Sequence, residues 1–153
     1  MNIEYRRATA DQIELLVTTR VEVLRAANRL DESADLSAVA AQSRDYYLRA
    51  LRDGTHTGLL AFDGEDFVGA GGVSYFRVMP TCHNVTGWKA YIMNMYVRPE
   101  YRRRGIATRM LDLLVADARA RGIGLISLEA TDAGRPLYEK YGFIPMTHEM
   151  ELP

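Results

Sequence analysis

The sequence predicts an α/β fold in which a mixed, mostly antiparallel sheet of six or seven strands carries helices on both faces. Strand-like segments follow one another in the middle of the chain, and strand-like and helical segments alternate in its second half. That order is typical of mixed sheets with helices packed on them. The chain has 153 residues, of which 48% are hydrophobic and 25% charged. This is the composition of a globular protein, and the length fits one domain over residues 1–153.

Six segments have the length and apolar content of β-strands. They are residues 3–6, 57–62, 66–78, 90–97, 125–130 and 146–152. Asp63 and Gly64, between the second and third segments, predict a hairpin turn because Asp-Gly favours the tight turns that join antiparallel strands. The glycines at 69, 71 and 72 inside the third segment indicate a bulge or a close approach of another backbone.

Four further segments carry helical signals. Thr9 and Gln12 form a capping-box pattern, which marks a helix start. Apolar residues then recur at helical spacing, namely Ile13, Leu16, Val17, Val21 and Leu24. The other predicted helices are residues 36–51, the amphipathic segment 106–121 and the short segment 135–141, which Pro136 opens and Gly142 closes.

Charge, cysteine content and the lack of long apolar runs argue against nucleic-acid binding, metal binding and membrane association. A formal net charge of -1 gives no basic field of the kind that nucleic-acid-binding proteins carry, so we expect no nucleic-acid partner. The lone Cys82 and the widely separated His56, His83 and His148 form no metal-ligand pattern, and we expect no metal. The first residues lack the apolar core of a signal peptide, and no apolar run reaches the length of a membrane span. This predicts a cytoplasmic protein without a membrane partner.

The segment VRPEYRRRGIAT (residues 97–108) joins a predicted strand to a predicted helix and has the features of an anion-binding site. Backbone N–H groups at a helix start have no acceptor within the helix, and the macrodipole adds positive character there. Gly105 permits close approach of a ligand, and three arginines share the turn. The segment therefore predicts a site for a polyanion such as a pyrophosphate. It is neither a Walker loop nor a Rossmann fingerprint, and a solvated arginine-rich turn is the alternative.

The spacing Arg102-x-x-Gly105-x-Ala107 resembles the acetyl-CoA motif of the GNAT acetyltransferases, (Gln/Arg)-x-x-Gly-x-(Gly/Ala). About thirty residues further on, LYEKYGF (residues 137–143) is similar to the Leu-Tyr-x-x-x-Gly-Phe segment of the same family. Two motifs in the right order are more specific than either alone. The resemblance extends over residues 91–143 and implies an acyl-CoA N-acyltransferase fold.

The resemblance also implies which residues contact acetyl-CoA. Backbone groups of Met95, Tyr96 and Val97 would pair with the pantetheine arm as if it were another strand. The pyrophosphate site would comprise Arg102, Arg103, Arg104, Gly105, Ile106, Ala107 and Thr108. Tyr138 would lie against the cofactor and protonate the leaving thiolate, and Glu129 matches a carboxylate that serves as general base in some members.

Two positions depart from the family pattern. Many members place a glutamate base on the fourth strand, where this chain has Asn94, and the asparagine that often touches the cofactor is replaced by the turn at residues 132–135. The implied reaction is acetyl transfer to a primary amine by direct attack in a ternary complex. A catalytically inactive acyl-CoA-binding regulatory module and an RNA-binding domain are the alternatives, and a homodimer is compatible with the family.

The acceptor is left open by the sequence. Trp88, Tyr75 and Phe76 flank the predicted loop 79–89, where they would line an acceptor pocket or belong to the core. The acidic residues Asp31, Glu32 and Asp35 would attract a cationic acceptor or form a solvated loop. Small polyamines, amino acids, antibiotics and protein amines all fit these observations.

Overall fold

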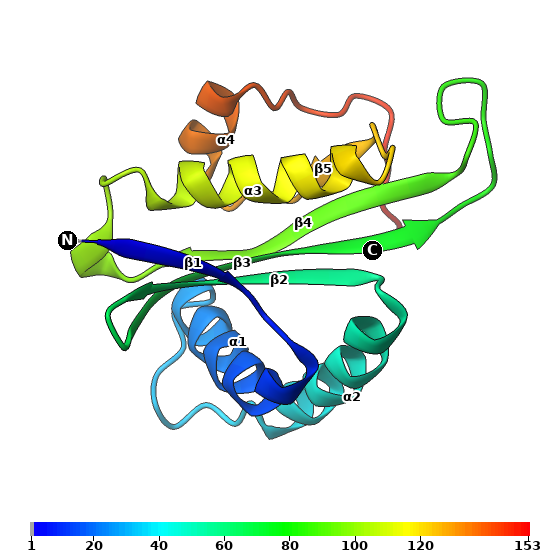
Figure 1. The fold of residues 1–153 in the computed structure, drawn as a ribbon. Coiled ribbons are helices and arrows are strands. Elements are labelled where there is room, and N and C mark those ends of the chain that lie inside the picture. Colours follow the sequence, from blue (N-terminus) through cyan, green and yellow to red (C-terminus); the bar gives the residue numbers. More distant parts are fainter. Residues whose placement is uncertain (1) are drawn as a thin grey trace.

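Five strands form one sheet in the order β1-β2-β3-β4-β5 in a computed structural model that describes residues 2–153. The strands are β1 (Ile3–Arg7), β2 (His56–Asp63), β3 (Asp66–Arg77), β4 (Trp88–Val97) and β5 (Ile126–Leu128). Strands β1 to β4 pair antiparallel with one another, and β5 runs parallel to β4. Helices α1 (Ile13–Ala27) and α2 (Ser37–Asp53) cover one face, and α3 (Ile106–Ala120) and α4 (Arg135–Tyr141) cover the other (Figure 1).

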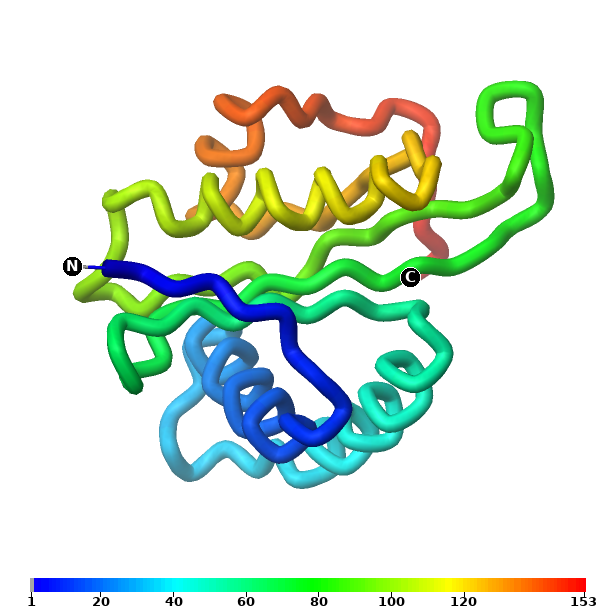
Figure 2. Tube along the Cα trace, in the orientation of Figure 1, coloured from blue at the N-terminus to red at the C-terminus, as the bar shows by residue number. Residues whose placement is uncertain are grey.

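The predicted mixed sheet with helices on both faces is confirmed, but the predicted strand number is wrong. The described residues form five strands rather than six or seven, and residues 146–152 do not form the predicted last strand. This segment comes after α4 and turns toward the sheet (Figure 2), and none of its described residues makes a backbone hydrogen bond. Met150 and Leu152 are both 97% exposed. An alternating pattern forms a strand only where a neighbouring strand satisfies its backbone groups.

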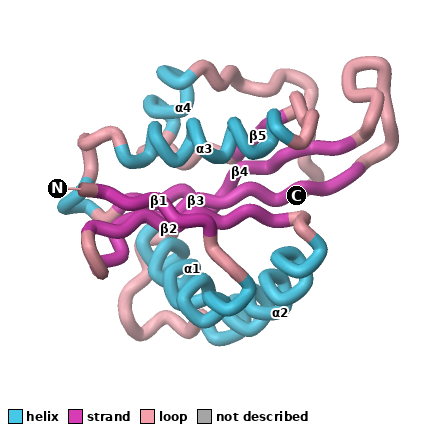
Figure 3. Tube along the Cα trace, in the orientation of Figure 1, coloured by secondary structure: helices cyan, strands magenta, loops and turns pink. Residues whose placement is uncertain are grey.

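The helix predictions agree with the structure apart from small shifts at the ends. The capping box is present, with the Thr9 N–H donating to Gln12 Oε1 at 2.9 Å, and it caps a 3₁₀ turn (Ala10–Gln12) that leads into α1. Helix α2 runs two residues beyond the predicted end and stops at Gly54, whose φ is 80°. The predicted hairpin turn joins β2 to β3, and the longer loop between β3 and β4 projects beyond the sheet (Figure 3).

Two apolar cores hold the layers together, one on each face of the sheet. Between the sheet and α3, the core includes Val68, Val73, Ile92, Met110, Leu111 and Leu114, each at most 1% exposed. Between the sheet and the first two helices, the core includes Leu16, Val17, Tyr47, Leu60 and Phe62. Full burial of such a side chain contributes roughly 1.5–3 kcal/mol. The two cores therefore fix α1 and α3 against opposite faces of β4.

None of the helices in residues 2–153 is both long and apolar enough to cross a membrane. Within the same residues, no three His, Cys, Asp or Glu side chains are grouped in a way that would hold a metal ion.

Candidate active site

The site begins where β4 and β5 separate. Their paired residues are Ala90 with Ile126, Tyr91 with Ser127 and Ile92 with Leu128. Because β5 ends at Leu128, residues 93–97 have no described strand beside them on that side. On its other side β4 stays paired with β3, whose register shifts between Ala70 and Gly72. The second half of β4 therefore presents an open edge, which an extended ligand can join as another strand would.

A bulge in β4 lies at the point of separation. Asn94 has a left-handed φ of 62°, and an extra residue in that conformation bends a strand and re-aims its side chains. The predicted close approach at the β3 glycines is confirmed here. A Cβ atom on Gly69 would lie 2.8 Å from the Tyr96 carbonyl oxygen, and one on Gly71 would lie 2.7 Å from Met95 Sδ. At Gly69 the obstacle is backbone, so a side chain there would displace β4 from its bent path.

The turn after β4 forms the second part of the site. A 3₁₀ turn (Pro99–Tyr101) leads to Arg103, with a φ of 61°, and to Gly105, with a φ of 80°, which caps the start of α3. Backbone N–H groups of the first helical turn have no acceptor within the helix. A Cβ on Gly105 would meet no atom within 4 Å, so the space beside this residue is open. An anionic group can approach the backbone there.

The arginines of the turn have different surroundings. Arg102 is turned back, and its Nε donates a 2.9 Å hydrogen bond to the Val97 carbonyl oxygen at the end of β4. The Arg104 guanidinium lies over the Tyr101 ring, 5.3 Å from the ring centroid, and the Tyr101 hydroxyl donates to Asp63 Oδ2 at 2.9 Å. Arg102 thus ties the turn to the strand, which fixes the helix start relative to the open edge of β4.

Tyr138 lies on α4, which Pro136 opens and Gly142 ends. Its ring packs edge-on against Phe143, with centroids 6.0 Å apart, and a Cβ on Gly134 would lie 3.1 Å from the ring. Burial raises the pKa of the Tyr138 hydroxyl above its ordinary value. The phenol therefore keeps its proton at neutral pH and remains a potential acid.

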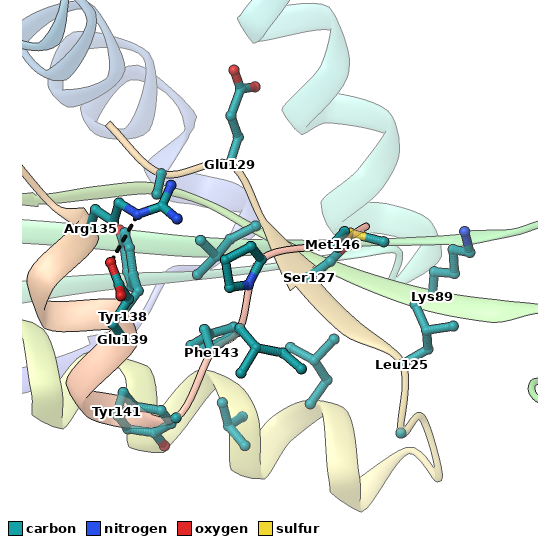
Figure 4. A pocket seen from close by; sticks show the side chains of 18 of the residues that line it. Lys89, Leu125, Ser127, Glu129, Arg135, Tyr138, Glu139, Tyr141, Phe143 and Met146 are labelled. Atoms are coloured by element: carbon teal, nitrogen blue, oxygen red, sulfur yellow. Dashed lines mark hydrogen bonds and ion pairs between the residues drawn. The ribbon is translucent and has the colours of Figure 1, made fainter. Parts of the chain in front are cut away.

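Tyr138 also lines a pocket of about 820 Å³ between β5, α4 and the segment that follows α4 (Figure 4). Lys89, Phe143 and Met146 are among the residues that line it. None of its lining residues belongs to residues 90–108, so the open edge of β4 and the arginine turn lie outside it.

Glu129 directly follows β5 and projects away from Tyr138 and Arg135 (Figure 4). It is exposed. Burial and then the nearby Glu129 charge raise the pKa of Tyr91. Tyr91 alternates along β4 with Ala90 and Ile92, which belong to the core under α3, so its side chain lies on the α1 and α2 face. Glu129 and Tyr138, which packs against the core under α3, thus lie on opposite faces of the sheet.

A polar cluster on the α1 and α2 face was not predicted from the sequence. The Tyr46 hydroxyl lies 2.9 Å from His56 Nδ1 and 2.6 Å from Ser74 Oγ. Burial, and secondarily the charge of Arg20, lower the pKa of His56 to about 4, so this imidazole is neutral at pH 7. Arg20 itself donates from Nη1 to Asn94 Oδ1 at 2.9 Å. The sequence does contain one clue to Arg20, which is a charged residue at a position of α1 where the helical spacing favours an apolar one. No sequence pattern points to the cluster of Tyr46, His56 and Ser74.

The aromatic residues considered for an acceptor pocket lie in different surroundings. Tyr75 is buried at 4% exposure and donates to the Asp117 carboxylate under α3, which places it in the core. Phe76 and Trp88 are 41% and 36% exposed at the base of the projecting loop, and Cys82 is exposed within that loop. Asp31 and Asp35 accept backbone N–H groups of Ser33 and Ser37 within their own exposed loop. The structure brings none of these residues to the separated strands.

Comparison with known proteins identifies the family to which this fold and turn belong. The profile of the Acetyltransferase (GNAT) family matches residues 22–143, so the chain belongs to the GNAT family of acetyltransferases. The family and the structure solved with acetyl-CoA support acetyl transfer from acetyl-CoA as the general reaction. No curated protein matches the sequence.

Solved structures agree with this assignment. A predicted acetyltransferase from Clostridium acetobutylicum, crystallised with acetyl-CoA, is 34% identical with a TM-score of 0.90, covering 99% of this chain and 96% of its own. A GCN5-related N-acetyltransferase from Ralstonia eutropha JMP134 is 31% identical with a TM-score of 0.84, covering 99% and 98%. An aminoglycoside acetyltransferase from an uncultured soil sample is 21% identical with a TM-score of 0.77, covering 100% and 99%, and shares the fold.

Proposed function

We propose that this chain transfers the acetyl group of acetyl-CoA to a primary amine, by direct attack of the amine in a ternary complex. The observation that carries the proposal is the continuity of two features. The open edge of β4 at residues 93–97 leads directly into the turn that ends at Gly105 and the start of α3. An extended arm along the strand would therefore end with its anionic group at the helix start.

The residues present fit acetyl-CoA. Met95, Tyr96 and Val97 would hold the pantetheine arm through their backbone groups, and the segment from Arg102 to Thr108 would hold the pyrophosphate, with open space beside Gly105. Acetyl-CoA supplies an activated acyl group. In the balanced reaction the amine nitrogen bonds to the acetyl carbon and the carbon–sulfur bond breaks. The ammonium loses two protons, of which one ends on the sulfur and the other goes to a base or to solvent.

Two side chains would transfer these protons. Tyr138, kept protonated by burial, would donate to the departing sulfur. Glu129, on the opposite face of the sheet, would accept a proton from the amine directly or through water. A lysine-like amine with a pKa of about 10.4 is only about 0.04% neutral at pH 7, which corresponds to roughly 4.6 kcal/mol. A base or a desolvating site must offset this cost.

An inactive acyl-CoA-binding module is the second candidate, and Asn94 favours it. This residue occupies the place where many family members have a glutamate base, and its Oδ1 already accepts the Arg20 hydrogen bond. Thiol release from acetyl-CoA in the presence of an amine panel, combined with calorimetry of acetyl-CoA binding, separates the two. Amine-dependent thiol release supports the enzyme. Binding without thiol release for any amine supports the module.

A further inference from the structure

Arg20 occupies an unusual position on α1. The sheet-facing stripe of this helix includes Ile13, Leu16, Val17 and Val23, all at most 9% exposed. Arg20 falls on the same stripe, three residues after Val17 and three before Val23, and is partly buried. Side chains at this spacing share one helix face. The sequence therefore places an arginine where the packing of α1 on the sheet would favour an apolar residue.

The guanidinium reaches the bulge at which β4 leaves β5. Its Nη1 donates to Asn94 Oδ1 at 2.9 Å, while a guanidinium has five N–H donors in all. Over residues 2–153, no carboxylate forms an ion pair with Arg20. Acidic residues of the same helix pair with other arginines instead, Glu14 with Arg44 and Glu22 with Arg98. The Arg20 charge is thus left without a counter-ion beside the separated strands.

Two further groups near Arg20, His56 and Tyr47, are uncharged. Its charge acts on His56 and Tyr47, but burial is the main cause that lowers the pKa of His56 to about 4 and raises that of Tyr47 to about 12. Both groups are neutral near pH 7. Removing a cation from water without a counter-ion costs free energy. An anionic ligand would offset this cost, and a guanidinium fork matches a carboxylate in shape.

A negative group lies nearby on the same face. Because Ile92 pairs with Leu128, residue 129 lies beside β4 at the level of Met93, one residue before Asn94. Glu129 approaches the Tyr91 hydroxyl closely enough to raise its pKa, after burial. Neighbouring strands lie about 4.8 Å apart and rise about 3.3 Å per residue, so the positive and negative groups flank the strand separation within a short distance.

We propose that Arg20 binds a carboxylate of the acceptor, so that the acceptor is a small amino acid whose amine and carboxylate are separated by few bonds. This inference rests on the proposed acetyl transfer and names its substrate class. The carboxylate lies on Arg20 beside the β4 bulge, and the ammonium lies toward Glu129. The amine then stands at the strand separation, where the acetyl group of a pantetheine arm along β4 would end.

The test compares each acceptor with its own amide, which lacks the negative charge. Initial rates of thiol release from acetyl-CoA are measured with the L-amino acids, β-alanine and 4-aminobutyrate, each beside its own amide. We expect at least one acid to exceed its amide by about 100-fold in kcat/KM. Arg20→Gln should remove this preference by lowering kcat/KM for the acid about 100-fold, while KM for acetyl-CoA stays unchanged.

Matched variants keep the result interpretable. Arg44→Gln removes an exposed arginine on α2 that pairs with Glu14, and it should leave the acid-to-amide ratio unchanged. Arg20→Lys keeps the positive charge without the planar fork and should retain part of the preference; it also replaces Arg20→Gln if that variant does not fold. Equal rates for acids and amides, transfer only to amines without a carboxylate, or a preference that persists in Arg20→Gln would overturn the inference.

A binding measurement distinguishes failure of the proposed acetyl transfer from failure of the carboxylate site. If acetyl-CoA binds but no amine releases thiol, calorimetric titration of the same amino acids into the coenzyme-A-loaded protein still tests the site. Binding of an acid but not of its amide, lost in Arg20→Gln, supports carboxylate recognition without catalysis. Absence of binding for every acid overturns it.

Discussion

The Arg102 guanidinium and the Val97 carbonyl oxygen are joined by a 2.9 Å hydrogen bond from Nε. The bond spans the turn between the end of β4 and the start of α3 and so sets the two parts of the cofactor site relative to each other. A hydrogen bond with a charged donor contributes roughly 1.5–3 kcal/mol. The motif arginine therefore acts on the turn itself, besides any contact with the cofactor.

The first prediction concerns this bond. Arg102→Ala should raise KM for acetyl-CoA about tenfold or more and leave KM for the amine nearly unchanged, because the loss affects the helix start rather than the acceptor face. Steady-state kinetics with acetyl-CoA varied at a saturating amine measure it. Arg49→Ala removes an exposed arginine on α2 and is the control. An unchanged KM for acetyl-CoA in Arg102→Ala would contradict the role assigned to this bond.

Local signals explain which parts of the site could be predicted from sequence. Gly105 with its positive φ, Pro136 at the start of α4 and the β3 glycines act through their own backbones, so their sequence positions carry the information. Arg20 could not be assigned this way, since its partner Asn94 lies 74 residues away. The strand prediction for residues 146–152 was wrong because no neighbouring strand among the described residues pairs with them.

The second prediction uses two glycines with the same backbone geometry. Gly105 begins α3 with a φ of 80° and Gly122 follows its end with a φ of 75°, and a Cβ on either would meet no atom within 4 Å. Valine at either position should therefore carry a similar cost of about 1–2 kcal/mol for the left-handed backbone. Calorimetry should show weakened coenzyme A binding for Gly105→Val alone, because only there would the side chain block a ligand. Equal affinity in the two folded variants would remove Gly105 from the site.

The third prediction concerns stability against pH and uses buried His56. Its pKa is lowered to about 4, mainly by burial, against about 6.5 in the unfolded chain. The unfolded state therefore binds more protons between these values, so the stabilising contribution is complete above pH 6.5 and is lost as pH falls toward 4. From pH 7.5 to pH 5.0 this group alone should reduce the free energy of unfolding by about 2 kcal/mol.

Urea denaturation at the two pH values measures this loss. His56→Gln keeps a polar side chain that does not titrate, so its pH-dependent loss should be about 2 kcal/mol smaller than that of the wild-type chain. His148→Gln replaces an exposed histidine and should follow the wild-type curve. Parallel curves for His56→Gln and the wild-type chain would show that His56 titrates normally in the fold.

The fourth prediction concerns Glu129. Because this carboxylate is exposed, water can take its place, and Glu129→Gln should reduce kcat/KM by less than about 100-fold at pH 7, the low end of the range for base catalysis. The deficit should shrink at pH 9, where more of the amine is neutral. Glu139→Gln, on α4 and paired with Arg135, is the control. A loss above roughly a thousandfold that persists at pH 9 would make Glu129 indispensable.

The last prediction concerns Tyr138 as the proton donor to the departing sulfur. Burial holds the pKa of this phenol above its usual value of about 10, so the acid remains protonated as pH rises through the neutral range. Activity that depends on it should fall only at pH values above that raised pKa. Tyr138→Phe removes the hydroxyl and keeps the ring that packs on Phe143. We expect kcat to fall by roughly 10²–10⁴-fold, the usual range for a lost acid.

The pattern of the kinetic change distinguishes catalysis from packing. KM for acetyl-CoA should change little in Tyr138→Phe, because the proton is shared in the transition state rather than in the bound ground state. Tyr141→Phe is the matched control on the same helix, since its hydroxyl donates to Asp112 at 2.9 Å on the surface. That variant should keep kcat within about twofold, because surface substitutions usually change free energies by less than about 0.5 kcal/mol. Pre-steady-state measurements establish whether the chemical step limits turnover. With that step limiting, a near-wild-type kcat in folded Tyr138→Phe would assign the proton to water instead.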